Sequence, residues 1–306
     1  MTGSRDRTQR GRAERPIGVF DSGIGGLTVV AALRRRLPAE SVLYLGDTAR
    51  LPYGSKSPET VTRYTRNNLG FLIDKGVKAV VVACNTASAL ALPRLERYEP
   101  QVPTWGVIEP GAQQAAEVSR GRVGVIATES TVRSGAYTSA LHRRRSDLEV
   151  HAQACPLLVP LVEEGWHDDP VTEEVARRYL DPLLGAGIDT LVLGCTHYPL
   201  LKPLLQRVAG SDVTLVDSAD AVARVVADSL ASLGLARERT PHEAKPSDEP
   251  PLESHLFVTD ASSGFARFAH RILAEEDLPL EWVDVRAEAV PESGSTEEGQ
   301  QVQSRP

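Results

Sequence analysis

Two cysteines of the chain, Cys84 and Cys195, follow apolar runs that have the character of buried strands. Residues 79–83 (AVVVA) precede the first and residues 191–194 (LVLG) precede the second, and a hydroxyl-bearing residue follows each cysteine within two positions. Ligands of open α/β sheets bind outside the carboxyl ends of the strands. We therefore expect the two thiols to face one cleft.

A pair of thiols can act as an acid and a base on one carbon. A free cysteine has a pKa of about 8.5, and a helix N-terminus or a nearby cation lowers this pKa, so a thiol and a thiolate can coexist near neutral pH. On opposite faces of a stereocentre, the thiolate can remove a proton and the thiol can return one. Because the Cα proton of an amino acid is a very weak acid, the site must stabilise the carbanion with fixed dipoles and exclude water.

Two other uses of these cysteines are compatible with the sequence. Free cysteine is commonly a small buried hydrophobic residue, which is our expectation for Cys155. Cys84 and Cys195 could also form a redox pair. A disulfide requires Cα atoms within roughly 7 Å of each other, however, and strand ends on separate domains need not meet that condition.

Polar residues close to the two thiols are candidates to assist them. Asp21 and His197 can each assist a sulfur, and the turn at residues 23–26 exposes backbone N–H groups that suit a carboxylate. The turn lacks the G-x-G-x-x-G fingerprint and a following Gly-Lys-Ser/Thr, so the sequence does not favour a nucleotide. Further side chains that can hold carboxylates are Asn85, Thr86 and Thr196.

Composition restricts the class of protein. The 306 residues suffice for two domains with their own cores, and the net charge of −7 argues against a nucleic-acid-binding surface. The sequence has no apolar stretch long enough for a spanning helix, and no apolar segment follows the N-terminal arginines as it would in a secretory signal. Three cysteines whose spacings fit neither a disulfide framework nor a metal site indicate a reducing, cytoplasmic setting.

The order of elements predicts an α/β fold. Apolar runs of strand character alternate with amphipathic helices, which is typical of parallel sheets joined by right-handed crossovers. We expect two similar doubly wound parallel-sheet domains that face each other across a central cleft. The expected strands are residues 17–20, 41–45, 77–83, 104–108, 123–127, 148–152, 190–194, 213–216, 255–259 and 281–285, and the expected helices include residues 27–37, 58–70, 219–233 and 264–274.

The predicted domains are discontinuous. The first takes residues 16–109 and 219–286, and the second takes residues 110–218. A cleft that shields a carbanion must open to exchange its substrate, so we expect hinges at residues 109–111 and 217–220. The basic tail of residues 1–15 and the acidic tail of residues 287–306 are expected to be disordered, and residues 241–251 to form a solvated loop.

Two residues have a structural interpretation beside a functional one. Tyr53 lies in a segment rich in proline, glycine and serine (residues 51–58), which predicts an ordered loop that an aromatic side chain can anchor. Glu163 lies beside an apolar run, where an acidic residue is more typical of a solvated edge than of a cleft.

Four motifs resemble the signature motifs of the cofactor-independent glutamate racemases. They are DSGIGGL at residues 21–27, PYG at 52–54, ACNTA at 83–87 and GCTHYPLL at 194–201, in the family's order, and the resemblance covers residues 17–273. It implies that the protein interconverts L- and D-glutamate without pyridoxal phosphate or a metal, and that it supplies D-glutamate for bacterial peptidoglycan. The arginine-rich start, the insertion at residues 241–251 and the acidic tail depart from the family pattern.

The resemblance also implies roles for individual residues. Cys84 would deprotonate D-glutamate with the support of Asp21, and Cys195 would deprotonate L-glutamate with the support of His197. Asp47 and Glu163 match positions where the family carries further acidic groups near the site. The residues that would bind the substrate are Asp21, Ser22, Tyr53, Gly54, Asn85, Thr86, Thr196 and His197.

Other functions stay open at this point. A racemase for aspartate or another acidic amino acid would differ by one methylene in the pocket, which changes binding by only about 1–3 kcal/mol. A secondary protein-binding role, such as the restraint of DNA gyrase that some glutamate racemases are thought to exert, has only the basic residues 1–15 in its support. The resemblance further implies a homodimer, and neither a membrane nor a nucleic acid is expected as a partner.

Overall fold

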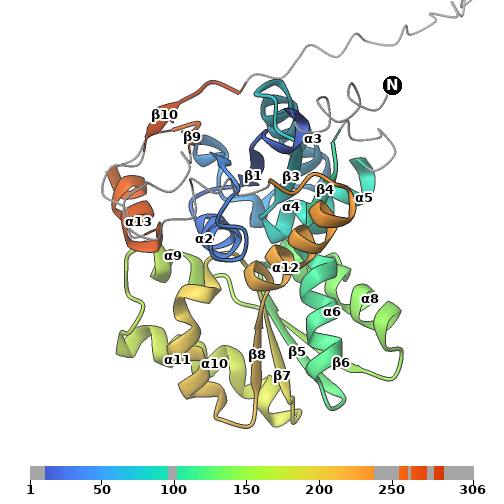
Figure 1. The fold of residues 1–306 in the computed structure, drawn as a ribbon. Helices are drawn as coiled ribbons and strands as arrows, with labels where there is room; N and C mark the ends of the chain where they lie inside the picture. The colour runs from blue at the N-terminus through green and yellow to red at the C-terminus, as the bar shows by residue number, and fades with distance from the viewer. Residues whose placement is uncertain (1–10, 96–101, 238–254, 261–262, 274–278, 286–306) are drawn as a thin grey trace, which may run out of the picture.

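The computed structural model describes residues 11–95, 102–237, 255–260, 263–273 and 279–285 (Figure 1). Two parallel sheets form two lobes, one above the other in the view of Figure 1. We call the lobe of the six-stranded sheet the first lobe and that of the four-stranded sheet the second lobe.

The first lobe is built on a parallel sheet in the order β10-β9-β2-β1-β3-β4. Its central strands β1 and β3 are buried along their whole length, as expected where helices cover both faces of a parallel sheet. The six strands are β1 (Ile17–Asp21), β2 (Val42–Gly46), β3 (Ala79–Val82), β4 (Thr104–Gly106), β9 (His255–Val258) and β10 (Leu280–Trp282).

The second lobe is built on a parallel sheet in the order β6-β5-β7-β8. Its strand β7 is fully buried and lies between β5 and β8, so the residue that follows β7 emerges at the middle of the sheet edge. The strands are β5 (Arg122–Ala127), β6 (Glu149–Ala154), β7 (Thr190–Gly194) and β8 (Thr214–Asp217).

Helices cover both sheets, and α12 lies where the two lobes meet (Figure 1). Side chains cap the starts of some of these helices. Ser57 accepts a hydrogen bond from the Thr60 N–H at the start of α3, and Asp217 accepts one from the Asp220 N–H at the start of α12. The helices are α2 (Leu27–Arg36), α3 (Pro58–Asp74), α4 (Asn85–Leu90), α5 (Leu92–Leu95), α6 (Ile108–Val118), α7 (Glu129–Arg133), α8 (Ala136–Arg144), α9 (Leu158–Glu163), α10 (Pro170–Gly185), α11 (Lys202–Ala209), α12 (Ser218–Ser232) and α13 (Ser263–Leu273), with 3-10 turns at Thr48–Arg50, Tyr53–Ser55 and Tyr198–Leu201.

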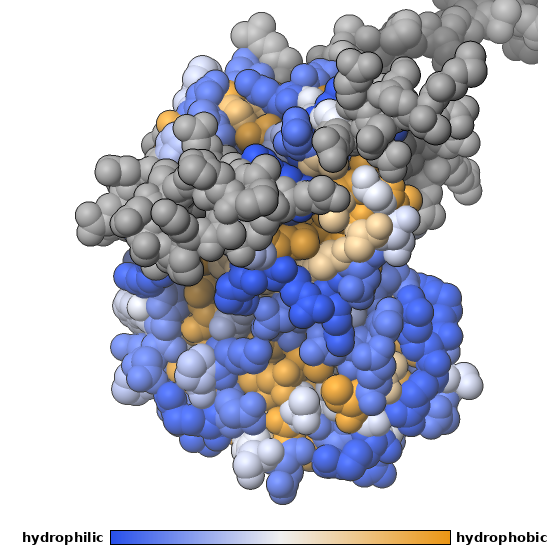
Figure 2. Space-filling model, in the orientation of Figure 1, coloured by the Kyte–Doolittle hydropathy of each residue, from blue (hydrophilic) through white to orange (hydrophobic). Residues whose placement is uncertain are grey.

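Each sheet carries an apolar cluster on either face. In the first lobe, Val19 and Val81 pack with α2 and α12 on one face, while Phe20 and Val82 pack with α3 on the other. In the second lobe, one face packs on α6 and α8 and the other on α10 and α11. On the face shown in Figure 2, hydrophilic side chains cover most of the second lobe, and apolar ones show at its junction with the first. The alternation of side chains along parallel strands thus fixes which face each helix covers.

The predicted fold class is confirmed, and several predicted elements need correction. The expected strand 104–108 ends at Gly106, and Ile108 and Glu109 already open α6. Pro110 is tolerated there because an N–H in the first helical turn has no partner within the helix, and Glu109 suits the positive end of the helix dipole. The expected strand 281–285 is found at Leu280–Trp282, and the predicted loop at residues 51–58 contains a 3-10 turn at Tyr53–Ser55.

Residues 11–15 of the predicted disordered tail are ordered in the structure. Residues 11–13 are helical, and the carbonyl of Ala13 accepts a hydrogen bond of 2.6 Å from Lys78 Nζ. Residues 1–10, the predicted loop at 241–251 and the predicted tail at 287–306 lie outside the described residues. The domain limits at residues 109 and 218 stay a prediction.

Within the described part of the chain, no helix combines the length and the apolar character that crossing a membrane requires.

A buried ion pair joins the start of β3 to the loop before β2. Lys78 and Glu40 form the pair, with side chains that are 0% and 3% exposed. Glu40 also accepts a hydrogen bond of 2.9 Å from the backbone N–H of Arg237. Burial lowers the pKa of Lys78, and the carboxylate of Glu40 opposes this shift. Lys78 therefore depends on Glu40 to stay charged inside the lobe.

Replacing Glu40 by glutamine should lower the free energy of unfolding by about 3 kcal/mol, because Lys78 would stay buried without its counter-charge. Urea unfolding followed by circular dichroism measures the change. Arg35→Gln is the matched control, since its pair with Asp220 is 65% and 52% exposed and such pairs contribute about 0–1 kcal/mol. Equal and small losses in the two variants would contradict a stabilising role for the buried pair.

Candidate active site

Three strands bring the predicted catalytic groups to the junction of the lobes. Asp21 is the last residue of β1, and Cys84 follows the neighbouring strand β3, so both lie at the carboxyl edge of the first sheet. Cys195 directly follows β7 in the second sheet. The thiols are buried, with Cys84 5% and Cys195 6% exposed.

The two strand-end motifs touch across the lobes. Thr196 Oγ1 donates to Asp21 Oδ1 at 3.4 Å, and Thr28 Oγ1 donates to the backbone carbonyl of Thr196 at 3.1 Å. A Cβ atom at Gly25 would lie 2.5 Å from His197 Nδ1, closer than real atoms come, so only glycine allows this approach. The glycine-rich turn after β1 therefore serves as the contact surface for the turn after β7.

Cys84 has an anionic partner. Its Sγ donates to the Ser22 hydroxyl at 3.3 Å. Burial raises the pKa of the Cys84 thiol to about 12, and the negative charge of Asp21 adds to the shift. A negative charge on Cys195 would act in the same direction. In this closed arrangement Cys84 is a protonated thiol at neutral pH.

Cys195 has a cationic partner. His197 Nδ1 lies 3.8 Å from Cys195 Sγ, and His197 Nε2 lies 3.1 Å from Glu163 Oε1. Burial lowers the pKa of His197, but the hydrogen bonds to Cys195 and Glu163 outweigh burial and raise this pKa to about 10. His197 is therefore an imidazolium at neutral pH, and Glu163 lies against the site although its sequence setting favoured a solvated edge.

Asp21 is held in one orientation by the turn that follows it. Its Oδ2 accepts a hydrogen bond of 3.0 Å from the Gly23 N–H. Burial raises the pKa of Asp21, while the positive charge of His197 and the N–H groups of Gly23, Gly26 and Ser22 oppose the shift. The carboxyl of Asp21 thus links the Cys84 side of the site to the His197 side.

The residues after Cys84 face side chains of the second lobe. Asn85 Oδ1 accepts a hydrogen bond of 2.7 Å from the Tyr137 hydroxyl, and Asn85 Nδ2 is buried without a partner among the described residues. The Thr86 hydroxyl lies 2.9 Å from that of Thr128 and 3.2 Å from that of Thr131. These groups leave donors in place for an anionic ligand.

Sequence reasoning missed Tyr137, Thr128 and Thr131. Thr128 directly follows β5, so the strand-end argument applied to Cys84 and Cys195 could have found it and its neighbour Thr131. No sequence signal marks Tyr137, which lies within α8.

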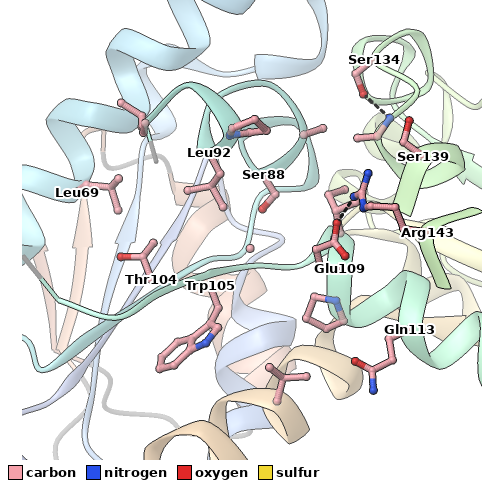
Figure 3. A pocket seen from close by; sticks show the side chains of 18 of the residues that line it. Leu69, Ser88, Leu92, Thr104, Trp105, Glu109, Gln113, Ser134, Ser139 and Arg143 are labelled. Atoms are coloured by element: carbon pink, nitrogen blue, oxygen red, sulfur yellow. Dashed lines mark hydrogen bonds and ion pairs between the residues drawn. The ribbon is translucent and has the colours of Figure 1, made fainter. Parts of the chain in front are cut away.

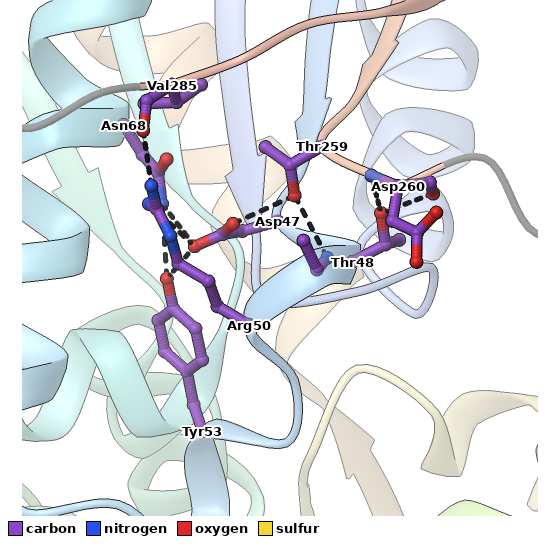
Figure 4. A network of polar contacts seen from close by, with 9 residues as sticks. Asp47, Thr48, Arg50, Tyr53, Asn68, Thr259, Asp260 and Val285 are labelled. Carbon is purple, nitrogen blue, oxygen red and sulfur yellow. Dashed lines mark hydrogen bonds and ion pairs between the residues drawn. The ribbon is translucent and has the colours of Figure 1, made fainter.

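Tyr53 and Asp47 belong to one buried network (Figure 4). The Tyr53 hydroxyl donates to Asp47 Oδ2, and Asn68 Nδ2 lies 3.1 Å from both oxygens. Thr259, after β9, donates to Asp47 Oδ1 at 3.0 Å. The Tyr53 side chain therefore anchors its loop, and Asp47 ties that loop to the C-terminal strands.

Gly54 is the other predicted binding residue of this loop, and it contacts the second lobe. Its carbonyl accepts a hydrogen bond of 2.6 Å from Ser130 Oγ, and a Cβ atom at Gly54 would lie 3.0 Å from Thr128 Cβ. The loop thus covers the site from the first lobe.

A cavity of about 750 Å³ opens elsewhere, among α3, α4, α5, α6 and α8 (Figure 3). Leu69, Leu92 and Trp105 supply part of its apolar wall, and the ion pair of Glu109 with Arg143 lies at its edge. None of the predicted site residues lines it. The thiols are instead enclosed, and among the described residues no three His, Cys, Asp or Glu side chains converge as metal ligands would.

The chain is similar to racemases over most of its length. The Asp/Glu/Hydantoin racemase family matches residues 18–226. The glutamate racemase of Geobacter metallireducens is 50% identical over 273 residues, which are 89% of this chain and 97% of that protein.

Two solved structures are similar in fold as well as in sequence. Glutamate racemase isoform RacE1 from Bacillus anthracis is 39% identical with a TM-score of 0.81, and the match covers 88% of this chain and 97% of that one. Glutamate racemase from Francisella tularensis in complex with D-glutamate is 36% identical with a TM-score of 0.80, and the match covers 90% and 100%.

The charge of His197 should depend on Glu163. The pKa of His197 lies above its ordinary value of 6.5, so its charge stabilises the fold fully below pH 6.5 and this contribution is lost as the pH rises through about 10. In Glu163→Gln one cause of the raised pKa is removed, so the stabilisation should be smaller and its loss should be complete at a lower pH.

Nitrogen NMR of the histidine rings across the pH range measures this pKa, with His197→Gln to identify the signal. Glu164→Gln is the control, because Glu164 is the exposed neighbour in sequence. A His197 ring that titrates near 6.5 in the parent protein, or equally in both glutamate variants, would contradict the pairing.

Proposed function

The chain belongs to the Asp/Glu/Hydantoin racemase family and is an amino-acid racemase, and we propose that it interconverts L- and D-glutamate with Cys84 and Cys195 as its two bases. The observation that carries this proposal is the meeting of the two thiol-bearing strand ends, with Thr196 bonded to Asp21 across the lobes. The polar partners beside the two sulfurs, Ser22 at Cys84 and His197 at Cys195, support it.

Glutamate as the substrate is supported by the relatives. The similar proteins of Geobacter metallireducens and Bacillus anthracis are glutamate racemases, and that of Francisella tularensis is described in complex with D-glutamate. The match spans nearly the whole length of each relative, so the whole catalytic unit is compared.

In the direction from L- to D-glutamate, Cys195 acts as the base. Its thiolate takes the Cα proton, the electron pair of the broken C–H bond stays on the substrate, and the Cys84 thiol delivers its proton to the opposite face. Cys84 ends as the thiolate and Cys195 as the thiol, so the reverse reaction starts from that state. His197 Nδ1 lies 3.8 Å from Cys195 Sγ, so the imidazole is placed to assist this sulfur.

Return of the enzyme to its first state needs proton exchange on both sulfurs. Asp21 and Ser22 lie beside Cys84, and His197 with Glu163 lies beside Cys195, so each sulfur has its own polar partners. We assign Asp21 and His197 to this support, and Glu163 to holding the His197 ring. Asp47 acts indirectly, because it holds the loop that carries Tyr53 and Gly54.

Binding of the two substrate carboxylates falls to donors around the thiols. Asn85 Nδ2 is a buried donor without a partner in the described part of the chain, and the Thr86 and Thr196 hydroxyls lie one or two residues from a catalytic sulfur. Ser22 and the backbone of the Tyr53–Gly54 loop complete the proposed set. Fixed dipoles of this kind stabilise the carbanion because they need no reorganisation during the reaction.

We further propose a cytoplasmic role in which the D-glutamate enters bacterial peptidoglycan, since the thiols must stay reduced. Growth of a D-glutamate-requiring bacterium after introduction of this chain would support that role, and continued dependence on added D-glutamate with active protein present would contradict it.

A homodimer stays a prediction from the family resemblance. A link to DNA gyrase stays a prediction as well, and residues 1–10 of the basic tail lie outside the described residues.

Cys84→Ala and Cys195→Ala should each reduce racemisation of glutamate by about 10²- to 10⁴-fold in both directions, because each variant lacks an acid in one direction and a base in the other. Circular dichroism of the reaction mixture measures the rate at which one enantiomer of glutamate is converted into the other. Cys155→Ala is the control, since Cys155 is packed in the second lobe and takes no part in the proposed chemistry. Near-parental rates in either catalytic variant would refute the two-thiol mechanism.

Glutamate should be preferred over aspartate when both are assayed side by side. A site built for the longer side chain loses about 1–3 kcal/mol with one methylene fewer, so kcat/KM should fall by about 10- to 200-fold. Equal or higher kcat/KM for aspartate would reassign the substrate while leaving the reaction class unchanged.

A further inference from the structure

We propose that Tyr137 is a positioning residue that orients the Asn85 amide toward the substrate and does so only when the two lobes are closed. The inference rests on the proposed function, in which Asn85 binds a substrate carboxylate. It assigns a role to a side chain that belongs to none of the recognised motifs.

Tyr137 and Asn85 come from different lobes. Tyr137 lies in α8 of the second lobe and is 3% exposed, while Asn85 begins α4 of the first lobe and is also 3% exposed. The Tyr137 hydroxyl donates to Asn85 Oδ1 at 2.7 Å. This is a buried hydrogen bond across the junction, next to Cys84.

The bond determines which way the amide points. When the amide oxygen accepts from Tyr137, the Nδ2 group faces away from Tyr137, and Nδ2 is a buried donor with no partner among the described residues. Buried donors are nearly always paired, so an acceptor from a ligand is the expected partner here. An amide rotated by half a turn would present its oxygen to a carboxylate and repel it.

The Tyr137 ring also lies next to a segment that is predicted to connect the lobes. A Cβ atom on Gly111, in the first predicted hinge, would lie 3.4 Å from Tyr137 Cε1 and from its hydroxyl, and 3.6 Å from Ser218 Cβ in the second. A Cβ atom on Gly194, which precedes Cys195, would lie 3.0 Å from Tyr137 Cε2. The Tyr137 side chain therefore lies next to the first predicted hinge and to both strand-end motifs.

These contacts couple substrate binding to closure. Parting of the lobes would carry Tyr137 away from Asn85, because the two residues belong to different sheets. The amide would then lose the bond that fixes its orientation. Tight binding of the substrate carboxylate thus requires the closed arrangement, in which the thiols are also shielded from water.

Tyr137→Phe tests this role because it removes only the hydroxyl and keeps the ring. We expect KM to rise about tenfold for both L- and D-glutamate, the effect of one lost hydrogen bond, while kcat changes by less than about threefold. Tyr179→Phe is the matched control. Its hydroxyl accepts a hydrogen bond from the Leu157 N–H and belongs to none of the proposed binding groups, so its KM should stay within about twofold of the parent value.

A double-variant comparison separates positioning from a purely structural role. If Tyr137 acts through Asn85, then Asn85→Ala and the combined Asn85→Ala/Tyr137→Phe should have the same KM. The combined variant loses both partners of the bond, so it keeps the test valid even where Tyr137→Phe alone does not fold. A purely structural role would instead lower the unfolding midpoint. Tyr137→Phe would then raise KM by the same factor in the parent protein and in Asn85→Ala.

Two results would overturn the inference: a KM of Tyr137→Phe within about twofold of the parent value, or a further rise of KM when Tyr137→Phe is added to Asn85→Ala. Failure of the proposed function would look different. The parent protein would then not racemise glutamate, or Cys84→Ala and Cys195→Ala would stay active.

Discussion

The contact between the turn after β1 and the turn after β7 is the constraint on which the site depends. Gly25 approaches His197 so closely that no side chain fits, and Thr196 hydrogen-bonds to Asp21. These turns lie at the carboxyl ends of strands in two separate sheets. Direct contact at this point brings the thiol-bearing ends of β3 and β7 to one junction, which neither lobe could achieve alone.

The electrostatics of the junction follow from its burial. Burial raises the pKa of the Cys84 thiol, and the carboxyl of Asp21 adds to that shift, while the hydrogen bonds of His197 to Cys195 and Glu163 outweigh burial and raise the pKa of its ring. In the proposed mechanism, these different surroundings distinguish an acid and a base of the same chemical type. If the thiols are the catalytic groups, their burial requires the lobes to part for substrate to enter, as predicted for hinges at residues 109–111 and 217–220.

Much of the fold could be predicted from the sequence, because apolar runs and helical periodicity report burial directly. Residues 190–194 are a strand as expected, and other strands differ by one to three residues at their ends. The start of α6 was missed because residues 104–110 mix strand-forming residues with a proline that a first helical turn accepts. Partners of polar side chains depend on tertiary contacts, so the bonds of Tyr53 to Asp47 and of Tyr137 to Asn85 had no signal in the sequence.

Isotope analysis at low conversion tests the central claim most directly. With L-glutamate in D2O, the two-thiol account predicts deuterium at Cα of the D-glutamate formed and none in the L-glutamate that remains, because the proton is taken on one face and a solvent-derived one is delivered on the other. Mass spectrometry after separation of the enantiomers gives both values. Protium retained in the product, or deuterium appearing equally in the recovered substrate, would show that a single base serves both faces and would contradict the account.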